Sequence, residues 1–128
     1  MPLYRCSVTP GLSSYEQRSR IAKEVTRVHC EVTDALPGFV HTFFAEDRDG
    51  RLPAGKRAYL LGSIRRGRTP EQKQRLRDEM ARALADTLGV AFDEVAVVTV
   101  DVPARWVMEG GRVLPEPGDD AAWLAAHG

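Results

Sequence analysis

Short runs of apolar residues alternate along the chain with longer segments in which apolar positions recur every three or four residues. The apolar-rich runs 3–8 and 59–64 end at polar or turn residues, as strands commonly do. The continuous β-branched run 95–100 predicts a strand buried on both faces, and the weaker run 40–44 predicts a partly exposed one. The pattern therefore predicts strands in both halves of the chain.

Each of the two amphipathic segments begins with a helix start signal. Ser14 is followed by Gln17, and Thr69 is followed by Pro70 and Gln72, so each start can form a capping box. One apolar face is expected on each helix, formed by Ile21, Val25, Val28 and Val32 in the first and by Leu76, Met80, Ala83 and Leu84 in the second. These faces require a sheet to pack against.

The two halves of the chain resemble each other. Sliding the sequence along itself so that residues 16–18 lie over 71–73 also places the strand-like run 40–46 over 95–101. Helix-like and strand-like segments thus align at the same offset. Each half is interpreted as one β-α-β unit.

These units predict the domain organisation and the fold class. We expect one domain over residues 1–128, with repeats at about 2–48 and 56–102 and a C-terminal cap at 103–128. Tandem β-α-β repeats with right-handed crossovers give an α/β fold, a four-stranded sheet with two helices on one face. The other face would stay uncovered in a single chain, which predicts association of subunits in a closed cyclic oligomer.

Composition and charge limit the classes of partner and cofactor that we expect. Lys plus Arg equals Asp plus Glu at 18 each, so no global field attracts nucleic acid or anionic lipid, and no apolar run approaches the length that spans a bilayer. Cys6 and Cys30 are too few for a disulfide framework and lack metal-site spacing. We therefore expect a cytoplasmic protein with no cofactor, no metal, no nucleic-acid partner and no membrane partner.

Pro2 is a candidate catalytic residue if the initiator Met1 is removed, as expected before a small residue. The exposed group would be a secondary amine at the start of a strand. An α-amino group has a reference pKa of about 7.7 to 8.0, and burial or nearby cations lower it, so it can act as a base near neutral pH. Many chains begin with Met-Pro without catalytic purpose, so the surroundings must decide.

A cationic turn, Arg65-Arg66-Gly67-Arg68, lies between the second-half strand and the cap residue Thr69. Ligands collect at the carboxyl ends of parallel strands, and a helix N-terminus there favours anions. Arg65 and Arg68 can hold a carboxylate by charge-assisted hydrogen bonds. A solvated basic turn and a phosphate or RNA contact are the alternatives, the latter disfavoured by the neutral chain.

Other polar residues allow two interpretations each. His29 lies beside the apolar stripe of the first helix, as either a structural histidine or a hydrogen-bond donor to substrate. Glu109 precedes Gly110-Gly111 and is either a surface carboxylate or a site residue. Cys6 and Cys30 are interpreted as buried fillers rather than nucleophiles.

Together these features resemble the tautomerase superfamily, and within it the cis-3-chloroacrylic acid dehalogenase group. The shared features are the Met-Pro start, His29, the Arg65-x-x-Arg68 pair, and a C-terminal run with Pro103-Ala104, Glu109, Gly111-Arg112, Leu114-Pro115 and Pro117-Gly118. The likeness extends over nearly the whole chain, and the C-terminal run is its most specific part.

The resemblance implies a homotrimer of doubled units with the tautomerase fold and with the N-terminal proline at the base of a pocket. Pro2 then takes the role of the catalytic amine, while Arg65 and Arg68 hold the carboxylate of a small acid substrate. In that family a helical histidine assists carboxylate binding and a late glutamate helps to activate water. These roles fall to His29 and Glu109.

One position departs from the group. Its glutamate acts with a tyrosine on the last strand, and the matching residue here is Val98, which cannot transfer a proton. Tautomerisation needs only a base and cations that stabilise an enolate. The expected function is keto-enol tautomerisation of a 2-hydroxy-dienoate or enolpyruvate-type acid. A weak cis-3-haloacrylate dehalogenase or hydratase and a non-catalytic trimeric binding protein are the alternatives.

Overall fold

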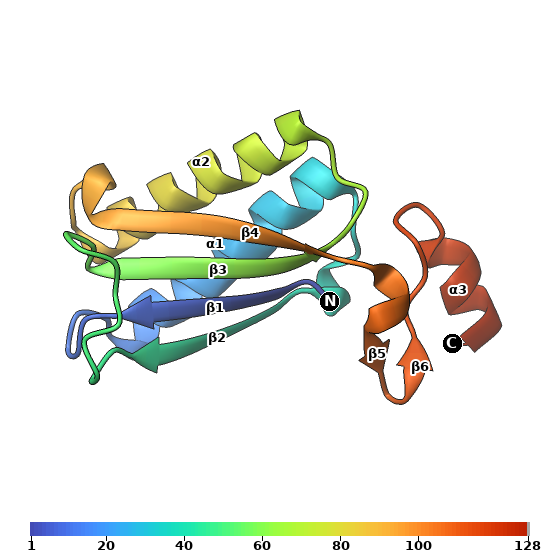
Figure 1. Cartoon of the computed structure of the whole chain (residues 1–128), viewed down its shortest axis with the longest axis horizontal. Helices are drawn as coiled ribbons and strands as arrows, with labels where there is room; N and C mark the ends of the chain where they lie inside the picture. Colours follow the sequence, from blue (N-terminus) through green and yellow to red (C-terminus); the bar gives the residue numbers. More distant parts are fainter. Residues whose placement is uncertain (128) are drawn as a thin grey trace.

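The computed structural model describes residues 1–127, and over this range the chain forms a four-stranded sheet in the order β2-β1-β3-β4 (Figure 1). β1 (Leu3–Val8) pairs in parallel with β2 (His41–Glu46), and β3 (Ala58–Arg65) pairs in parallel with β4 (Val95–Val102). The two pairs meet where β1 runs antiparallel to β3. The start of β1 and the end of β3 therefore lie at the same end of the sheet.

Two long helices, α1 (Tyr15–Thr33) and α2 (Pro70–Leu88), pack together on one face of this sheet (Figure 1). Both predicted capping boxes form. The side chains of Ser14 and Thr69 each accept a hydrogen bond from the backbone N–H of the glutamine three residues later. The side-chain oxygen of that glutamine accepts a hydrogen bond from the backbone N–H of the cap residue. The predicted α/β fold, a four-stranded sheet with two helices on one face, is confirmed.

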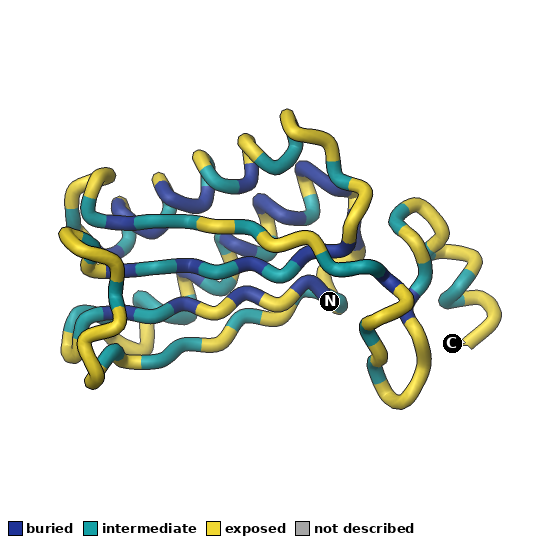
Figure 2. Tube along the Cα trace, in the orientation of Figure 1, coloured by how far each residue is buried: buried dark blue, intermediate teal, exposed yellow. Residues whose placement is uncertain are grey.

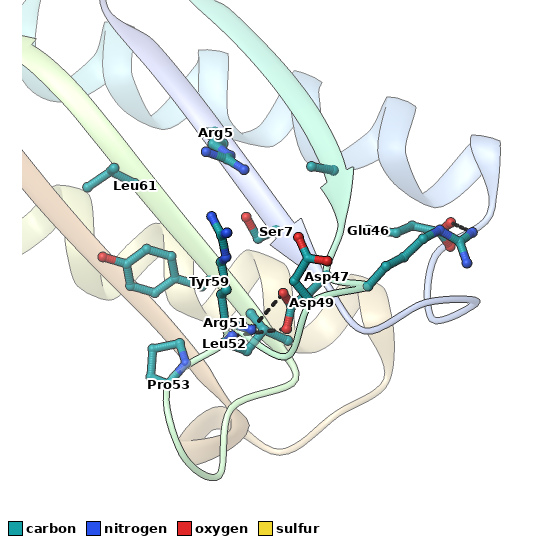
Figure 3. A pocket seen from close by; sticks show the side chains of 12 residues that line it. Arg5, Ser7, Glu46, Asp47, Asp49, Arg51, Leu52, Pro53, Tyr59 and Leu61 are labelled. Atoms are coloured by element: carbon teal, nitrogen blue, oxygen red, sulfur yellow. Dashed lines mark hydrogen bonds and ion pairs between the residues drawn. The ribbon is translucent and has the colours of Figure 1, made fainter.

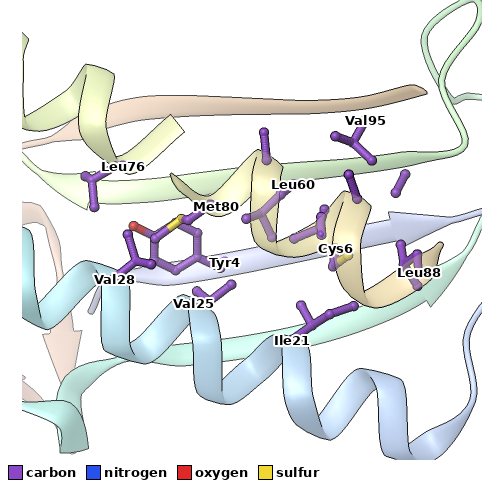
Figure 4. Packing of buried hydrophobic residues seen from close by; sticks show 14 of the residues in the cluster. Tyr4, Cys6, Ile21, Val25, Val28, Leu60, Leu76, Met80, Leu88 and Val95 are labelled. Carbon is purple, nitrogen blue, oxygen red and sulfur yellow. The ribbon is translucent and has the colours of Figure 1, made fainter. Parts of the chain in front are cut away.

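The core fills the space between the helices and the sheet (Figure 4). Its fully buried members include Tyr4, Cys6, Ile21, Val25, Val28, Leu60, Leu76, Met80 and Leu84. The predicted apolar face of α1 is buried as expected. On α2 the buried face includes Ala81 and Ala85, whereas the predicted Ala83 is only half-buried because it lies at the margin of that face.

The prediction that residues 95–100 form a strand buried on both faces is wrong for the single chain. Val95 is buried, but Val98 and Val100 are 39% and 46% exposed. The helices cover one face of the sheet, so residues of β4 that face the other side stay exposed. Figure 2 colours most of β4 as intermediate or exposed. Leu3 and Phe43 add further exposed apolar surface.

The C-terminal segment lies beyond the end of the sheet, beside the N-terminus (Figure 1). It contains the 3-10 turn η3 (Ala104–Trp106), the hairpin strands β5 (Met108–Glu109) and β6 (Arg112–Val113), and the helix α3 (Asp120–His127). Further 3-10 turns, η1 (Pro37–Phe39) and η2 (Phe92–Glu94), precede β2 and β4. No helix among residues 1–127 is both long and apolar enough to cross a lipid bilayer.

The β5–β6 hairpin explains the paired glycines of this segment. Gly110 and Gly111 have φ angles of 59° and 79°, both in the left-handed region that a two-residue hairpin turn requires. Glu109 directly precedes this turn and pairs with Arg112 across the hairpin. Its carboxylate contacts the N-terminal amine of Met1. The hairpin thus carries a sequence-predicted site residue to the start of β1.

Gly62 provides the space for the ring of Tyr4. A methyl group at Gly62 would lie 2.4 Å from Cε1 of Tyr4, a fully buried ring that cannot move aside. Gly62→Ala is therefore expected to lower the free energy of unfolding by about 1 to 3 kcal/mol, measured by urea denaturation. Gly38→Ala is the matched control, since a methyl group at that position would have no atom within 4 Å. Equal stability of the two variants would contradict this account.

Candidate active site

The predicted site residues come from separate elements that meet at one end of the sheet. Pro2 leads into β1, and Arg65 ends β3. Arg68 lies in the turn before α2, His29 in the last part of α1, and Glu109 at the end of β5. This convergence follows from the antiparallel pairing of β1 with β3, together with the docking of the C-terminal hairpin.

The N-terminal amine lies in a partly buried position beside a carboxylate. Met1 is buried, and its amine contacts Glu109. Burial and the charge of Arg65 lower the pKa of this amine from 8.0 to about 6, against an opposing contribution from Asp120. A cavity of about 400 Å³ is lined here by Met1, Pro2, Leu3, His41, Val107, Met108, Glu109 and Gly110. Pro2 and Glu109 therefore share one cavity.

His29 is buried and is held by a tyrosine. Oη of Tyr4 lies 2.7 Å from Nδ1 of His29. Burial raises the pKa of Tyr4, so the hydroxyl keeps its proton, and its hydrogen-bond partner among residues 1–127 is this ring nitrogen. A hydroxyl that donates to Nδ1 leaves the imidazole proton on Nε2. Nε2 is buried without a hydrogen-bond partner in the described chain.

Arg68 presents a second donor of this kind. Its Nη1 donates to the carbonyl oxygen of Thr33 at 3.3 Å, while its Nε is buried with no partner among residues 1–127. Burial and the nearby charge of Arg65 both lower the pKa of Arg68. A buried donor without a hydrogen-bond partner destabilises the folded protein. An anion is a strong acceptor for such a donor, especially where a positive charge lies nearby. Arg68 and His29 thus each leave a buried nitrogen without a hydrogen-bond partner in the described chain.

Arg65 is not free to bind a ligand in the way that the sequence predicted for both arginines. Its Nη1 and Nη2 donate to the two carboxylate oxygens of Asp120 at 2.7 and 3.0 Å, and Nη1 also donates to the carbonyl oxygen of Pro115 at 2.7 Å. The arginine side chain is 1% exposed. Both terminal nitrogens of Arg65 are therefore already engaged within the chain.

Comparisons with known proteins identify the family of this chain. A family model described as tautomerase enzyme matches residues 63–115, which include Arg65, Arg68 and Glu109. A probable tautomerase from Bradyrhizobium diazoefficiens is 37% identical over 54 residues, covering 42% of this chain and 81% of that protein. The crystal structure of N1, a member of the cis-3-chloroacrylic acid dehalogenase family, is 30% identical with a TM-score of 0.89, covering 97% of this chain and 91% of that one. The chain belongs to the tautomerase superfamily.

More distant structures show the same fold. A fused 4-OT described as a symmetric trimer is 20% identical to this tautomerase-superfamily chain with a TM-score of 0.77, covering 88% of this chain and 95% of that one. A malonate semialdehyde decarboxylase is 24% identical with a TM-score of 0.69, covering 97% of this chain and 98% of that one. Proteins named for different chemistries thus share this fold.

Two residues around the site were missed by sequence reasoning. Tyr4 alternates with the buried Cys6 and Val8 on β1, so its hydroxyl had to find a buried partner, which was the available signal. Asp120 begins a short helix far along the chain, and nothing near it in sequence indicates Arg65 as its partner. Only the docking of α3 brings the two together.

The cysteines lie outside this arrangement. Cys6 is part of the core, where burial raises the pKa of its thiol to about 12, so its interpretation as a buried filler is confirmed. Cys30 is only half-buried, and burial raises its pKa as well. No cluster of three or more His, Cys, Asp or Glu side chains in the described residues has metal-binding geometry.

A second hollow lies at the opposite end of the sheet and contains none of the predicted site residues. It has a volume of about 350 Å³ and is lined by charged and polar side chains that include Arg5, Asp49, Arg51 and Tyr59 (Figure 3). The carboxylate of Asp47 accepts backbone hydrogen bonds from the adjoining loop, so it shapes the rim. The chemistry expected of this family is concentrated at the other end.

The burial of His29 predicts a dependence of stability on pH. Burial, followed by the charges of Arg68, Arg65 and the terminal amine, lowers the pKa of His29 from 6.5 to about 3. Below pH 6.5 the unfolded chain gains a proton that the folded chain does not bind. The contribution of neutral His29 to the free energy of unfolding is therefore full above pH 6.5 and falls as the pH drops toward about 3.

Urea denaturation at pH 7.5 and 5 is expected to show a smaller decrease for His29→Gln than for the parent. His41→Gln, which removes an exposed histidine, is the matched control and keeps the parent's decrease. Parallel curves for the parent and His29→Gln would show that His29 titrates alike in both states.

Proposed function

We propose that this protein is a tautomerase that moves a proton between the oxygen and carbon of a 2-hydroxy-dienoate or enolpyruvate-type carboxylic acid. The observation that carries the proposal is the pair of buried donors without partners, Nε2 of His29 and Nε of Arg68, near an amine of lowered pKa. The donors supply anion binding and the amine supplies a base. Enol chemistry on a small acid needs both.

Pro2 is proposed as the base after removal of Met1. The burial and the Arg65 charge that lower the pKa of the Met1 amine would act similarly on a secondary amine one residue further along. A neutral amine accepts the enol O–H proton, and the resulting ammonium delivers a proton to carbon, so the O–H bond breaks as the C–H bond forms. The amine is regenerated in each cycle.

Arg68 and His29 are proposed to bind the substrate carboxylate, with Arg68 supplying the charge and neutral His29 a hydrogen bond. Arg65 is already paired with Asp120, so we assign it a contribution through its charge and through the position of the pair beside the amine. The sequence predicted that both arginines bind the carboxylate directly, and we now assign direct binding to Arg68 alone.

Glu109 and Val98 bear on the alternative reactions. Glu109 lines the cavity beside Pro2, which is where a water-activating carboxylate would have to lie. Val98 carries no group that can transfer a proton, and its side chain lies on the uncovered face of the sheet, four residues before the end of β4. Proton shuttling is therefore favoured over haloacrylate hydrolysis, with a weak dehalogenase or hydratase activity as the second candidate.

The assembly is proposed to be a homotrimer formed through the uncovered face of the sheet. Leu3, Phe43, Val98 and Val100 leave apolar surface exposed there, and similar folds are described as trimers. The two β-α-β repeats and the C-terminal cap are proposed as one domain, and the single sheet to which both repeats contribute strands supports this. The free cysteines fit a reducing, cytoplasmic setting.

The test is an assay of purified, Met-processed protein with two substrates. Ketonisation of phenylenolpyruvate, followed by ultraviolet absorbance, is the expected activity. Halide release from cis-3-chloroacrylate at the higher rate would favour the dehalogenase instead. If neither acid is turned over while light scattering shows intact trimers, the result would favour the third alternative, a non-catalytic binding protein.

A further inference from the structure

The C-terminal helix supplies a carboxylate to one of the two site arginines. Asp120, the first residue of α3, receives one hydrogen bond on each carboxylate oxygen from the guanidinium of Arg65. The Asp120 side chain is 14% exposed and that of Arg65 is 1% exposed. A paired, two-bond geometry in such a dry setting makes this a built contact rather than a transient surface pair.

The cap that carries Asp120 is docked by contacts of its own. Leu114 and Ala104 are buried. The indole nitrogen of Trp123 donates to the carbonyl oxygen of Val113 at 2.9 Å, and its ring meets Phe39 edge-on. A substrate that displaced Asp120 from Arg65 would have to replace two charge-assisted hydrogen bonds and loosen this packing. We therefore expect the ion pair to stay formed when a substrate binds.

This pairing changes the charge that a substrate meets. Asp120 offsets the charge of Arg65, so Arg68 is left as the half-buried cation with an unsatisfied donor, accompanied by the neutral ring of His29. Glu109 adds a negative charge at the cavity beside Pro2. Arg68 and His29 can bind one substrate carboxylate. A second carboxylate would be repelled by Glu109, and no unpaired cation in the described site would offset that repulsion.

We propose that Asp120 is a specificity-determining residue which, by offsetting part of the charge of Arg65, makes the site favour acids with one carboxylate over acids with two. The inference rests on the proposed function, since it concerns the substrate of that same site. Asp120 acts through Arg65 and does not touch the reacting atoms, so it is a positioning residue. Its effect should appear as a change in the relative use of two substrates.

The test compares a 2-hydroxy-2,4-dienoate that carries one carboxylate with the corresponding dienedioate that carries two. For Asp120→Asn, the ratio of kcat/KM for the diacid to that for the monoacid is expected to rise about tenfold, because a unit negative charge near a partly buried anion weakens its binding by at least this factor. Asp119→Asn is the matched control. It removes a neighbouring exposed carboxylate that makes no hydrogen bond or ion pair in the described chain, and it should keep the parent's ratio.

A ratio that stays at the parent's value in folded Asp120→Asn would overturn the proposal, as would an equal rise in Asp119→Asn. The double variant Arg65→Met/Asp120→Met covers the case in which Asp120→Asn does not fold, because it leaves no buried charge unpaired and preserves the net charge. Its ratio should stay within about twofold of the parent. A fall of tenfold there would mean that Arg65 binds a carboxylate directly, and the proposal would be wrong.

The failure of the proposed function can be told apart from failure of this inference. Calorimetry with hexanoate and adipate measures binding of one and two carboxylates without turnover. If the parent turns over neither dienoate and does not ketonise phenylenolpyruvate, the proposed function fails. The inference then stands if Asp120→Asn still gains affinity for adipate relative to hexanoate, and it falls if the relative affinity is unchanged.

Discussion

Blocking the Pro2 amine is expected to lower kcat/KM for phenylenolpyruvate ketonisation by about 10² to 10⁴, the range that a positioned acid or base contributes. The block is made by retaining residues ahead of Pro2, which turns its nitrogen into an amide without a basic lone pair. The chain is otherwise unchanged, so the loss isolates the amine. Mass spectrometry of each preparation establishes whether Met1 is present.

The pH profile of the processed protein provides the control for this result. If the amine is the base, kcat/KM falls at low pH as the amine becomes protonated, with a pKa below the ordinary range of about 7.7 to 8.0. Burial and the charge of Arg65 lower the pKa of the Met1 amine, and we expect them to act in the same direction on the amine of Pro2. Full activity in the blocked chain, or a profile that is flat through this range, would remove Pro2 from the mechanism.

Arg68→Ala is expected to lower kcat/KM for the same acid by about 10- to 100-fold, mainly through a higher KM. The change removes the charge and the buried Nε that await an anion, and a hydrogen bond to a charged group is worth about 1.5 to 3 kcal/mol. Steady-state kinetics over a range of substrate concentrations separate KM from kcat.

Arg66→Ala is the matched control for this change. Arg66 lies in the same turn and carries the same charge, but it is exposed, and its backbone N–H donates to the carbonyl oxygen of Val102. Its replacement removes one cation from the same turn while sparing the buried donors. Equal losses in Arg66→Ala and Arg68→Ala would indicate a general attraction of acids to the turn rather than a specific site.

Local signals predicted the elements well because they act over a few residues. The capping boxes at Ser14 and Thr69 depend on partners three residues away, and the apolar face of α1 depends on a helical repeat. The four-stranded sheet with both helices on one face followed from repeating one β-α-β unit. The run 95–100 misled because β-branched composition indicates a strand without indicating what covers each face.

The site was predictable only in part, for a physical reason. The residues that resemble a known family, such as Arg68 and Glu109, could be named, but their contacts depend on packing between distant segments. The Arg65–Asp120 pair joins residues on different elements through docking of the cap, and the Tyr4–His29 bond joins a strand to a helix. No spacing along the chain encodes either contact.

The antiparallel meeting of β1 and β3 makes the two ends of this sheet topologically alike, yet they are chemically unequal. Where β1 begins at the chain terminus, β3 begins after Arg57, whose nitrogen is a peptide N–H that donates to the carbonyl oxygen of Glu94 at 2.7 Å. The turn after β1, residues 9–14, has no arginine to match the cationic turn after β3. The two similar halves therefore differ in what they bring to the end of the sheet where β1 begins, because the first half brings the start of its own strand and the second half brings the cationic turn.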